Sequence, residues 1–286
     1  MHLTRREFLS ATAAAGLGTV VTGSGASAAT LSSPLVGARM GDISWARANS
    51  EIGPLRVTRL YYPGALPTRF TRAGIPDGVR LIVSYKNRSA NTGGYVRSIP
   101  TWARVEVCYH HEPEGTHDDY WGEKTVAGPR FVAEFKAEQA TIAAANPAIP
   151  MVFIGGGYQY TGGAQSSRGI GGHFIPPTAD YHYMDTYQTD RIIPASQTPS
   201  VRNFIAELGK KGARLNGFSE YARGVAPLSW ATTQARIKVF ATDSTWLRSR
   251  PGIRSWCYWN TTDQDGRQWR LMDAASQDAW SRVAAL

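Results

Sequence analysis

Short segments that predict β-strands recur eight times along the chain. In one of them, Val105, Val107 and Tyr109 alternate with more polar neighbours, and this period of two is typical of a strand. The predicted strands are Val36–Gly41, Val57–Tyr62, Arg80–Tyr85, Ala103–His110, Met151–Gly156, Tyr181–Thr186, Gly217–Glu220 and Ser255–Asn260.

Longer segments between the later strands have the period of amphipathic helices. They are Arg130–Ala145, Ser200–Gly209 and Trp230–Leu247. The first three connections are short, and Pro67–Ala73 and Thr92–Ser98 leave room for barely two helical turns. Strands and helices alternate over about 250 residues, which predicts an α/β protein with a (β/α)8 TIM barrel. An open doubly wound sheet is the alternative fold.

The densest run of ionisable residues, Cys108–Gly115, lies where one predicted strand ends. Pro113 and Gly115 prevent this strand from continuing, so Glu112 is expected at or just past its carboxyl end. A second glutamate, Glu220, ends a short strand farther along the chain. Ligands bind and catalytic side chains gather at the carboxyl ends of parallel strands. The two glutamates are therefore predicted to face one substrate as a pair.

Residues 1–28 have the features of an export signal. A twin-arginine motif at Thr4–Leu9 precedes a weakly apolar run to Val21 and a cleavage signal at Ala26–Ala28. The apolar run is too short and too rich in Ala, Gly and Thr to anchor a protein in a bilayer. We therefore expect a secreted protein without a membrane anchor, in which residues 29–286 form one domain.

Composition narrows the classes of function. The formal net charge is +9, but the lysines and arginines are scattered and no nucleic-acid-binding motif accompanies them. Nucleic acid is therefore not an expected partner. The only cysteines, Cys108 and Cys257, both fall within predicted strands, and two buried free thiols are expected rather than a disulfide.

The positions of the two glutamates resemble a known arrangement. Glutamates that end the fourth and seventh strands are similar to the acid/base and nucleophile of the retaining glycosidases of clan A. Within that clan, the pair His111-Glu112 resembles the His-Glu of glycoside hydrolase family 26, which is known for β-mannanases and related endo-glycanases.

Two further motifs carry this resemblance, which spans the chain from Gly37 to Asn260. The segment Asp185–Tyr187 is similar to the family's Asp-X-Tyr, and Trp259-Asn260 is similar to its Trp-Asn sugar platform. The sequence departs from the family where an aromatic residue usually follows the acid/base closely, because Trp121 comes later here.

The resemblance implies hydrolysis of a glycosidic bond with retention, in a polysaccharide and without a cofactor. Glu112 would act first as general acid and then as base, and Glu220 would be the nucleophile. Tyr187 would donate a hydrogen bond to Glu220 and hold it in line. The remaining sugar-contacting residues would be His111, Asp185, Trp121 and Trp259. A retaining mechanism predicts that the two carboxyl groups lie about 5 to 5.5 Å apart. We expect a monomer.

Neighbouring residues have structural interpretations. His110 is expected to be a core histidine, because alternation puts His111 on the opposite side. Glu114 is expected to be a loop charge beyond Pro113. Gly155–Gly157 lacks the spacing of a phosphate-binding loop and is expected to be a turn where backbone segments approach closely.

Two other functions stay open. The first is a metal-dependent hydrolase, because ligand-type side chains crowd around Glu112, although none has an established ligand spacing, and no metal site is predicted. These side chains are His110, His111, Glu112, Glu114, His117, Asp118 and Asp119, and Asp263–Gly266 has a faint likeness to a calcium loop. The second is a non-catalytic carbohydrate-binding barrel, against which the presence of both glutamates argues.

Overall fold

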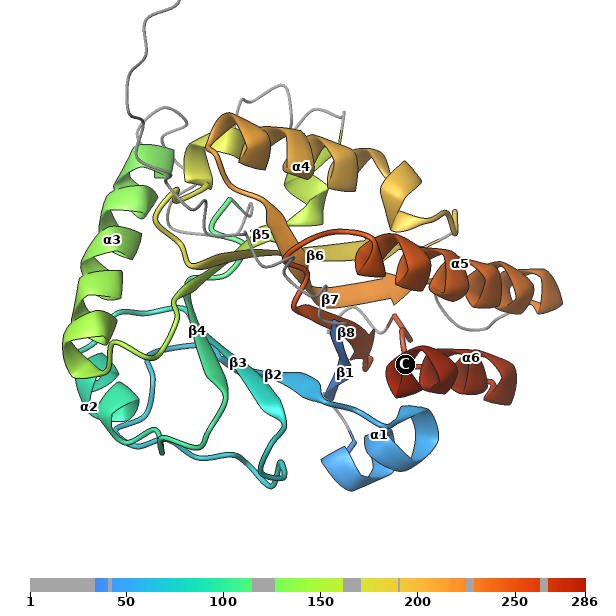
Figure 1. The fold of residues 1–286 in the computed structure, drawn as a ribbon, viewed down its shortest axis with the longest axis horizontal. Helices are drawn as coiled ribbons and strands as arrows, with labels where there is room; N and C mark the ends of the chain where they lie inside the picture. The colour runs from blue at the N-terminus through green and yellow to red at the C-terminus, as the bar shows by residue number, and fades with distance from the viewer. Residues whose placement is uncertain are drawn as a thin grey trace, which may run out of the picture. The chain divides into compact units, whose positions relative to one another are not determined.

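Eight parallel strands form a barrel in the computed structural model, which describes residues 34–40, 43–114, 127–161, 171–189, 191–224, 229–262 and 267–286 (Figure 1). The strands are β1 (Leu35–Met40), β2 (Val57–Tyr62), β3 (Arg80–Tyr85), β4 (Val105–Tyr109), β5 (Val152–Gly156), β6 (Tyr181–Gln188), β7 (Leu215–Arg223) and β8 (Ser255–Asn260). They pair in the order β4-β3-β2-β1-β8-β7-β6-β5. A parallel bridge between Val107 and Met151 joins the two end strands and closes the sheet.

Helices surround this barrel (Figure 1). They are α1 (Trp45–Ile52), α2 (Asn91–Arg97), α3 (Ala127–Ala145), α4 (Pro199–Lys210), α5 (Trp230–Arg248) and α6 (Ala274–Ala285), with short 3-10 turns η1 (Gly157–Tyr160), η3 (Gly171–Phe174) and η4 (Ala195–Gln197). The predicted (β/α)8 fold is confirmed, and closure of the sheet excludes the open alternative. Within the described residues, no helix is both long and apolar enough to cross a membrane. The predicted export signal, residues 1–28, lies outside the described residues.

The early connections are short, as predicted. α2 has 7 residues, and the predicted turns at Pro67–Ala73 form no helix, so β2 passes to β3 through irregular chain. The helices α1 and α6 were not predicted. α6 has a periodic apolar stripe of Ala279, Trp280 and Val283, and its first turn is capped by the side chain of Asp273. This stripe was therefore a readable signal in the sequence.

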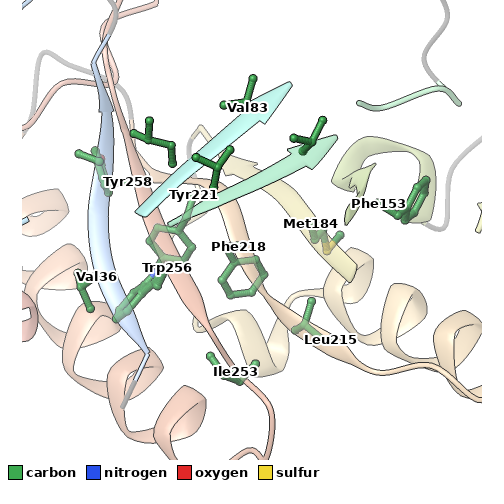
Figure 2. Packing of buried hydrophobic residues seen from close by; sticks show 14 of the residues in the cluster. Val36, Val83, Phe153, Met184, Leu215, Phe218, Tyr221, Ile253, Trp256 and Tyr258 are labelled. Atoms are coloured by element: carbon green, nitrogen blue, oxygen red, sulfur yellow. The ribbon is translucent and has the colours of Figure 1, made fainter. Parts of the chain in front are cut away.

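An aromatic cluster packs the last strands against the last helices. Figure 2 shows two of its members, Tyr221 and Trp256, next to each other in the core. The ring of Trp256 on β8 lies 5.3 Å from that of Tyr221 on β7 and 4.7 Å from that of Trp280 on α6. Phe240 of α5 stands 5.1 Å from Trp280. All four residues are fully buried, so each contributes a large apolar area to the layer between barrel and helices.

A second, smaller cluster fills the middle of the barrel, since its members come from six strands that meet only inside. They are Val57, Ile82, Cys108, Val152, Ile154, Tyr183 and Cys257. Both cysteines are free and buried, as predicted, and burial raises the pKa of the Cys108 thiol to about 12. These thiols are therefore packing groups.

Charged residues occupy the barrel on both sides of this apolar band. At the amino-terminal end, Glu106 accepts a hydrogen bond from the Tyr183 hydroxyl (2.7 Å) and lies 3.0 Å from Arg254 Nη2. Arg80 Nε stands 3.6 Å from the same carboxylate. These paired charges occupy the amino-terminal end of the barrel. The charges at the carboxyl end are arranged differently and form the site described below.

Candidate active site

A cleft of about 1260 Å³ opens at the carboxyl ends of the strands. It brings together five of the residues predicted from the sequence, which are His111, Glu112, Tyr187, Glu220 and Trp259. The predicted residue Trp121 lies outside the described residues. The predicted residue Asp185 does not line the cleft but lies beneath it.

A β-bulge in β7 directs Glu220 into the cleft. Met184 of β6 pairs with Phe218, but Asp185 pairs with Glu220, so β7 holds one extra residue at this point. The register between β7 and β8 shifts over the same stretch. Phe218 and Tyr221 both pack in the outer core, and the two residues between them therefore both face inward. Strict alternation would have turned Glu220 away from the barrel.

Two cations and a phenol contact the Glu220 carboxylate. Arg59 Nη1 lies 2.7 Å from Oε1, and Arg39 Nε lies 3.8 Å from the same oxygen. The hydroxyl of Tyr187 donates a hydrogen bond to Oε2. These contacts leave Glu220 only 6% exposed. They also hold its carboxylate in one orientation.

Asp185 anchors Arg59 from below. The Arg59 Nη1 group donates to Asp185 Oδ2 at 2.7 Å, and the Ser219 hydroxyl donates to Oδ1 at 2.5 Å. Asp185 has no exposed surface, so it does not contact the sugar as expected. It supports Arg59 instead. Arg59 also donates through Nε to Ser84 Oγ at 3.0 Å. The guanidinium is thus fixed on three sides.

Unusual backbone angles position Glu112 after β4. Glu112 has φ 50° and His110 has φ 49°, both in the left-handed region that residues other than glycine seldom adopt. Two hydrogen bonds hold this segment, from Glu112 N to Ile154 O (2.8 Å) and from Lys86 Nζ to His111 O (2.9 Å). Such strained conformations cluster at functional sites.

The two histidines face opposite directions, as predicted. The ring of His110 packs 6.4 Å from Phe131 of α3, and its Nδ1 lies 3.0 Å from Lys86 O. His111 lines the cleft with its ring edge-on to Tyr61 at 4.8 Å. Burial, with the charge of Arg59, lowers the pKa of His111 well below its usual value, so this ring is neutral.

The structure corrects the prediction for Glu114. This carboxylate is not an exposed loop charge but is completely buried, and its Oε1 accepts a hydrogen bond from Gly156 N at 2.8 Å. The sequence hid this because a residue beyond a strand-ending proline is usually at the surface. Glu114 instead ties the chain after β4 to the end of β5.

The glycines at the end of β5 provide the expected close approach. A Cβ atom on Gly156 would lie 3.1 Å from Glu112 Oε1, and one on Gly157 would lie 2.5 Å from Asp185 O. Only glycine leaves this space. The segment therefore allows Glu112 to lie against β5 and β5 to lie against β6.

The environment separates the proton affinities of the two cleft glutamates. Burial raises the pKa of Glu112 well above its usual value, and the negative charges of Asp185 and Glu220 raise it further. Burial also raises the pKa of Glu220, to about 7, while Arg59 opposes this rise. Glu220 contacts a guanidinium and a phenol directly, whereas no described cation forms an ion pair with Glu112. Glu220 therefore loses its proton first.

Aromatic rings form part of the cleft wall. Arg39 covers one face of Trp259, with its guanidinium carbon 4.0 Å from the ring centre. The ring of Tyr187 meets Trp259 edge-on at 6.0 Å. Tyr158, which is 66% exposed, and Tyr61 line the same cleft. Such rings offer flat apolar faces for stacking.

Sequence reasoning missed the arginines of this site. Arg59 had a readable signal, because it is the one charged residue in the predicted strand Val57–Tyr62 and a charge inside a barrel strand needs a buried partner. Arg39, in the predicted strand Val36–Gly41, also pairs with Glu220 in the structure.

No group of three or more ligand-type side chains is arranged to hold a metal ion within the described ranges. Several side chains of the metal-site alternative lie outside those ranges, namely His117, Asp118, Asp119 and the segment 263–266. Within the described residues, the cleft holds two carboxylates and the groups that orient them.

Comparison with known proteins finds relatives only by structure. No family model matches the chain, and a search of curated proteins finds no match. A β-D-glucuronidase from Dictyoglomus thermophilum superposes with a TM-score of 0.53 and 10% identity over 84% of this chain and 46% of its own. A GH128 exo-β-1,3-glucanase from Aureobasidium namibiae has a TM-score of 0.51 and 12% identity over 86% of this chain and 92% of its own.

A GH26 β-mannanase from Bacteroides ovatus has a TM-score of 0.50 and 11% identity, and the match covers 88% of each chain. The chain spans 30% of the length of a Bacteroides uniformis β-glucuronidase, which it matches with a TM-score of 0.51 and 12% identity. At these identities the comparisons establish a shared barrel fold.

Proposed function

We propose that this protein is a retaining glycoside hydrolase that cleaves a polysaccharide, with Glu112 as acid/base and Glu220 as nucleophile. The observation that carries the proposal is the pairing of two strand-end glutamates in one cleft with different neighbours. Burial and nearby negative charge favour the protonated form of Glu112, whereas the contacts of Glu220 with Arg59 and Tyr187 favour its ionised form. Barrels of similar fold include a β-mannanase and an exo-β-1,3-glucanase.

In the proposed reaction Glu112 first donates a proton and later removes one, and Glu220 first forms a bond to the sugar and later loses it. Glu112 donates its proton to the oxygen of the leaving sugar while a Glu220 oxygen attacks the anomeric carbon, so a glycosyl ester forms as the glycosidic bond breaks. Glu112, now ionised, removes a proton from water, which attacks the same carbon and releases Glu220. Arg59 stabilises the carboxylate that leaves in this second step.

We further propose that the protein belongs to glycoside hydrolase family 26. This assignment is supported by the order of His111-Glu112, Asp185–Tyr187 and Trp259 along the chain and by their convergence at one end of the barrel. Trp259 would be the floor under the reacting ring, with one face covered by Arg39.

The test of the function is a screen of the mature protein on mannan, β-glucan, xylan, galactan and arabinan. Reducing ends and product sizes are measured, and the anomer that forms first is identified by proton NMR. Retention requires the product to have the configuration of the substrate. Release of the opposite anomer would show an inverting reaction and remove Glu220 from the role of nucleophile.

Tyr187→Phe is expected to slow turnover about 10- to 1000-fold with little change in substrate affinity, because it removes one hydrogen bond to a charged group in a partly dry site. The kinetic constants kcat and KM are measured separately. Tyr181→Phe, on the amino-terminal end of the same strand, is the matched control and should keep full activity. Equal activity of the two variants would mean that the contact of Tyr187 with Glu220 plays no part in turnover.

The pH dependence of kcat/KM should be bell-shaped, with both limbs above the usual glutamate pKa, because burial raises the pKa of Glu112 and of Glu220. Below the lower pKa Glu220 is protonated and cannot attack. Above the upper pKa Glu112 is ionised and cannot donate. The two limbs belong to the pair as a unit. Glu112→Gln should abolish the alkaline limb when the substrate has a leaving group that needs no proton.

We also propose that the enzyme acts outside the cell, because the twin-arginine motif and the cleavage signal precede the barrel. Protein recovered from the medium of an expressing culture should begin at Ala29, as determined by mass spectrometry. Intact protein that begins at Met1 and stays with the cells would contradict export.

A further inference from the structure

Positive side chains outnumber negative ones on the described wall of the cleft. Four arginines line it, Arg39, Arg59, Arg191 and Arg267, against the two glutamates Glu112 and Glu220. Arg59 is neutralised, because it lies 2.7 Å from both Glu220 and Asp185. Arg39 and Arg191 have donor capacity that no described residue uses.

Arg39 lies beside the proposed nucleophile with unused donors. Its guanidinium stacks on Trp259 at 4.0 Å, and its one ion pair within the described chain is the 3.8 Å contact to Glu220. It forms no hydrogen bond to any described residue, and its side chain is 19% exposed. A guanidinium has five N–H donors in a planar fork, and none of those of Arg39 forms a hydrogen bond with a described residue.

Arg191 extends the positive wall away from the catalytic pair. It follows β6 in the loop before α4, is exposed, and forms no ion pair or hydrogen bond with a described residue. An arginine on a cleft wall forms its strongest contact, a charge-assisted bidentate pair, with an anionic ligand. A neutral glycan offers only hydroxyl and ring oxygens, which give weaker hydrogen bonds.

We propose that the cleft binds a saccharide that carries a negative group, a uronate carboxylate or an acid ester, and that Arg39 and Arg191 recognise that group. This proposal names the substrate class of the same cleft. The turnover measurement described below rests on the proposed function, whereas the binding measurement does not depend on catalysis. The ligand is a saccharide because the arginines share the cleft with the faces of Tyr61, Tyr158 and Trp259.

The experiment compares polymers that differ only in charge. Polygalacturonate, alginate and hyaluronan are each paired with the same polymer whose carboxyl groups have been reduced to hydroxymethyl, and carrageenan is paired with its desulfated form. Binding is measured by affinity electrophoresis of full-length mature protein with the Glu220→Gln change, which prevents turnover. Turnover of the same polymers is then measured with the unmodified protein.

At least one acidic polymer should bind about tenfold or more tightly than its neutral counterpart, and added salt should weaken that binding. Arg191→Gln should remove most of the preference. Arg282→Gln, which removes one exposed cation from α6, is the matched control for non-specific attraction to a basic protein and should leave the preference intact. Preference for a carboxylate or for a sulfate identifies which negative group is read.

Equal binding of every acidic polymer and its neutral counterpart would overturn the inference. So would equal losses for Arg191→Gln and Arg282→Gln, because the attraction would then be unrelated to the cleft. Cleavage of a neutral glycan without any charge preference refutes acid recognition but leaves the glycosidase proposal standing. Cleft-dependent binding of an acidic glycan that is never cleaved supports acid recognition and refutes the glycosidase proposal.

Discussion

Glu220→Gln is expected to lower turnover on the order of 10⁴- to 10⁶-fold while the barrel stays folded. Glutamine keeps the size of the side chain and a hydrogen-bond acceptor for Tyr187, but its amide oxygen is a poor nucleophile. Arg59 keeps its 2.7 Å contact with Asp185, so the variant leaves no isolated buried charge. Turnover is measured on the best glycan of the screen, and folding is measured by circular dichroism and thermal unfolding.

The matched control is Glu207→Gln, which changes a glutamate on α4 that pairs with Lys210 outside the cleft. That variant should retain wild-type turnover. In addition, a mechanism-based fluoro-sugar should form a covalent adduct on Glu220, located by peptide mass spectrometry. Normal turnover of Glu220→Gln, or an adduct on another residue, would remove this glutamate from the proposed mechanism.

Arg59→Met is expected to lower the free energy of unfolding by about 3 to 5 kcal/mol at neutral pH. Arg59 is 2% exposed and lies 2.7 Å from two carboxylates, so its loss leaves Asp185 and Glu220 buried together with only the distant Arg39 as counter-charge. The defect should shrink as the pH falls, because protonation removes the repulsion. Chemical denaturation at several pH values measures this.

Two further variants separate charge from packing. Arg282→Met removes an exposed arginine and should change the free energy of unfolding by less than about 0.5 kcal/mol. Adding Asp185→Asn to Arg59→Met should recover part of the lost stability, because one of the two buried negative charges is gone. If the double variant is as unstable as the sum of the two single changes, Arg59 contributes by packing rather than by charge.

The local pattern of apolar and polar residues determined most of the fold. Eight strands, three of the longer helices and the short early connections follow from it, because short apolar segments suit strands that are buried on both faces and amphipathic segments suit the helices that cover them. The burial of Cys108 and Cys257 follows from their positions within such strands. Local sequence also marked Glu112, since Pro113 and Gly115 end its strand in a cluster of ionisable groups.

Partners of the site residues were decided by tertiary structure. Asp185 on β6 was expected to face the sugar, but across the interior of the barrel it meets Arg59 of β2. Glu114 was expected in solvent, but the chain after β4 folds back onto Gly156 and buries it. Contacts between residues so far apart in sequence depend on strand register and loop path, which periodicity does not encode.

The orientation of Glu220 is the clearest case of a feature that only the tertiary structure decided. Sequence alone placed this glutamate at the end of a strand, but a strict period of two would have turned it outward with Phe218. The extra residue in β7 turns Ser219 and Glu220 inward together while Phe218 and Tyr221 both remain in the outer core. A bulge of this kind is stabilised by the packing and pairing of the neighbouring strands β6 and β8, which local periodicity does not encode.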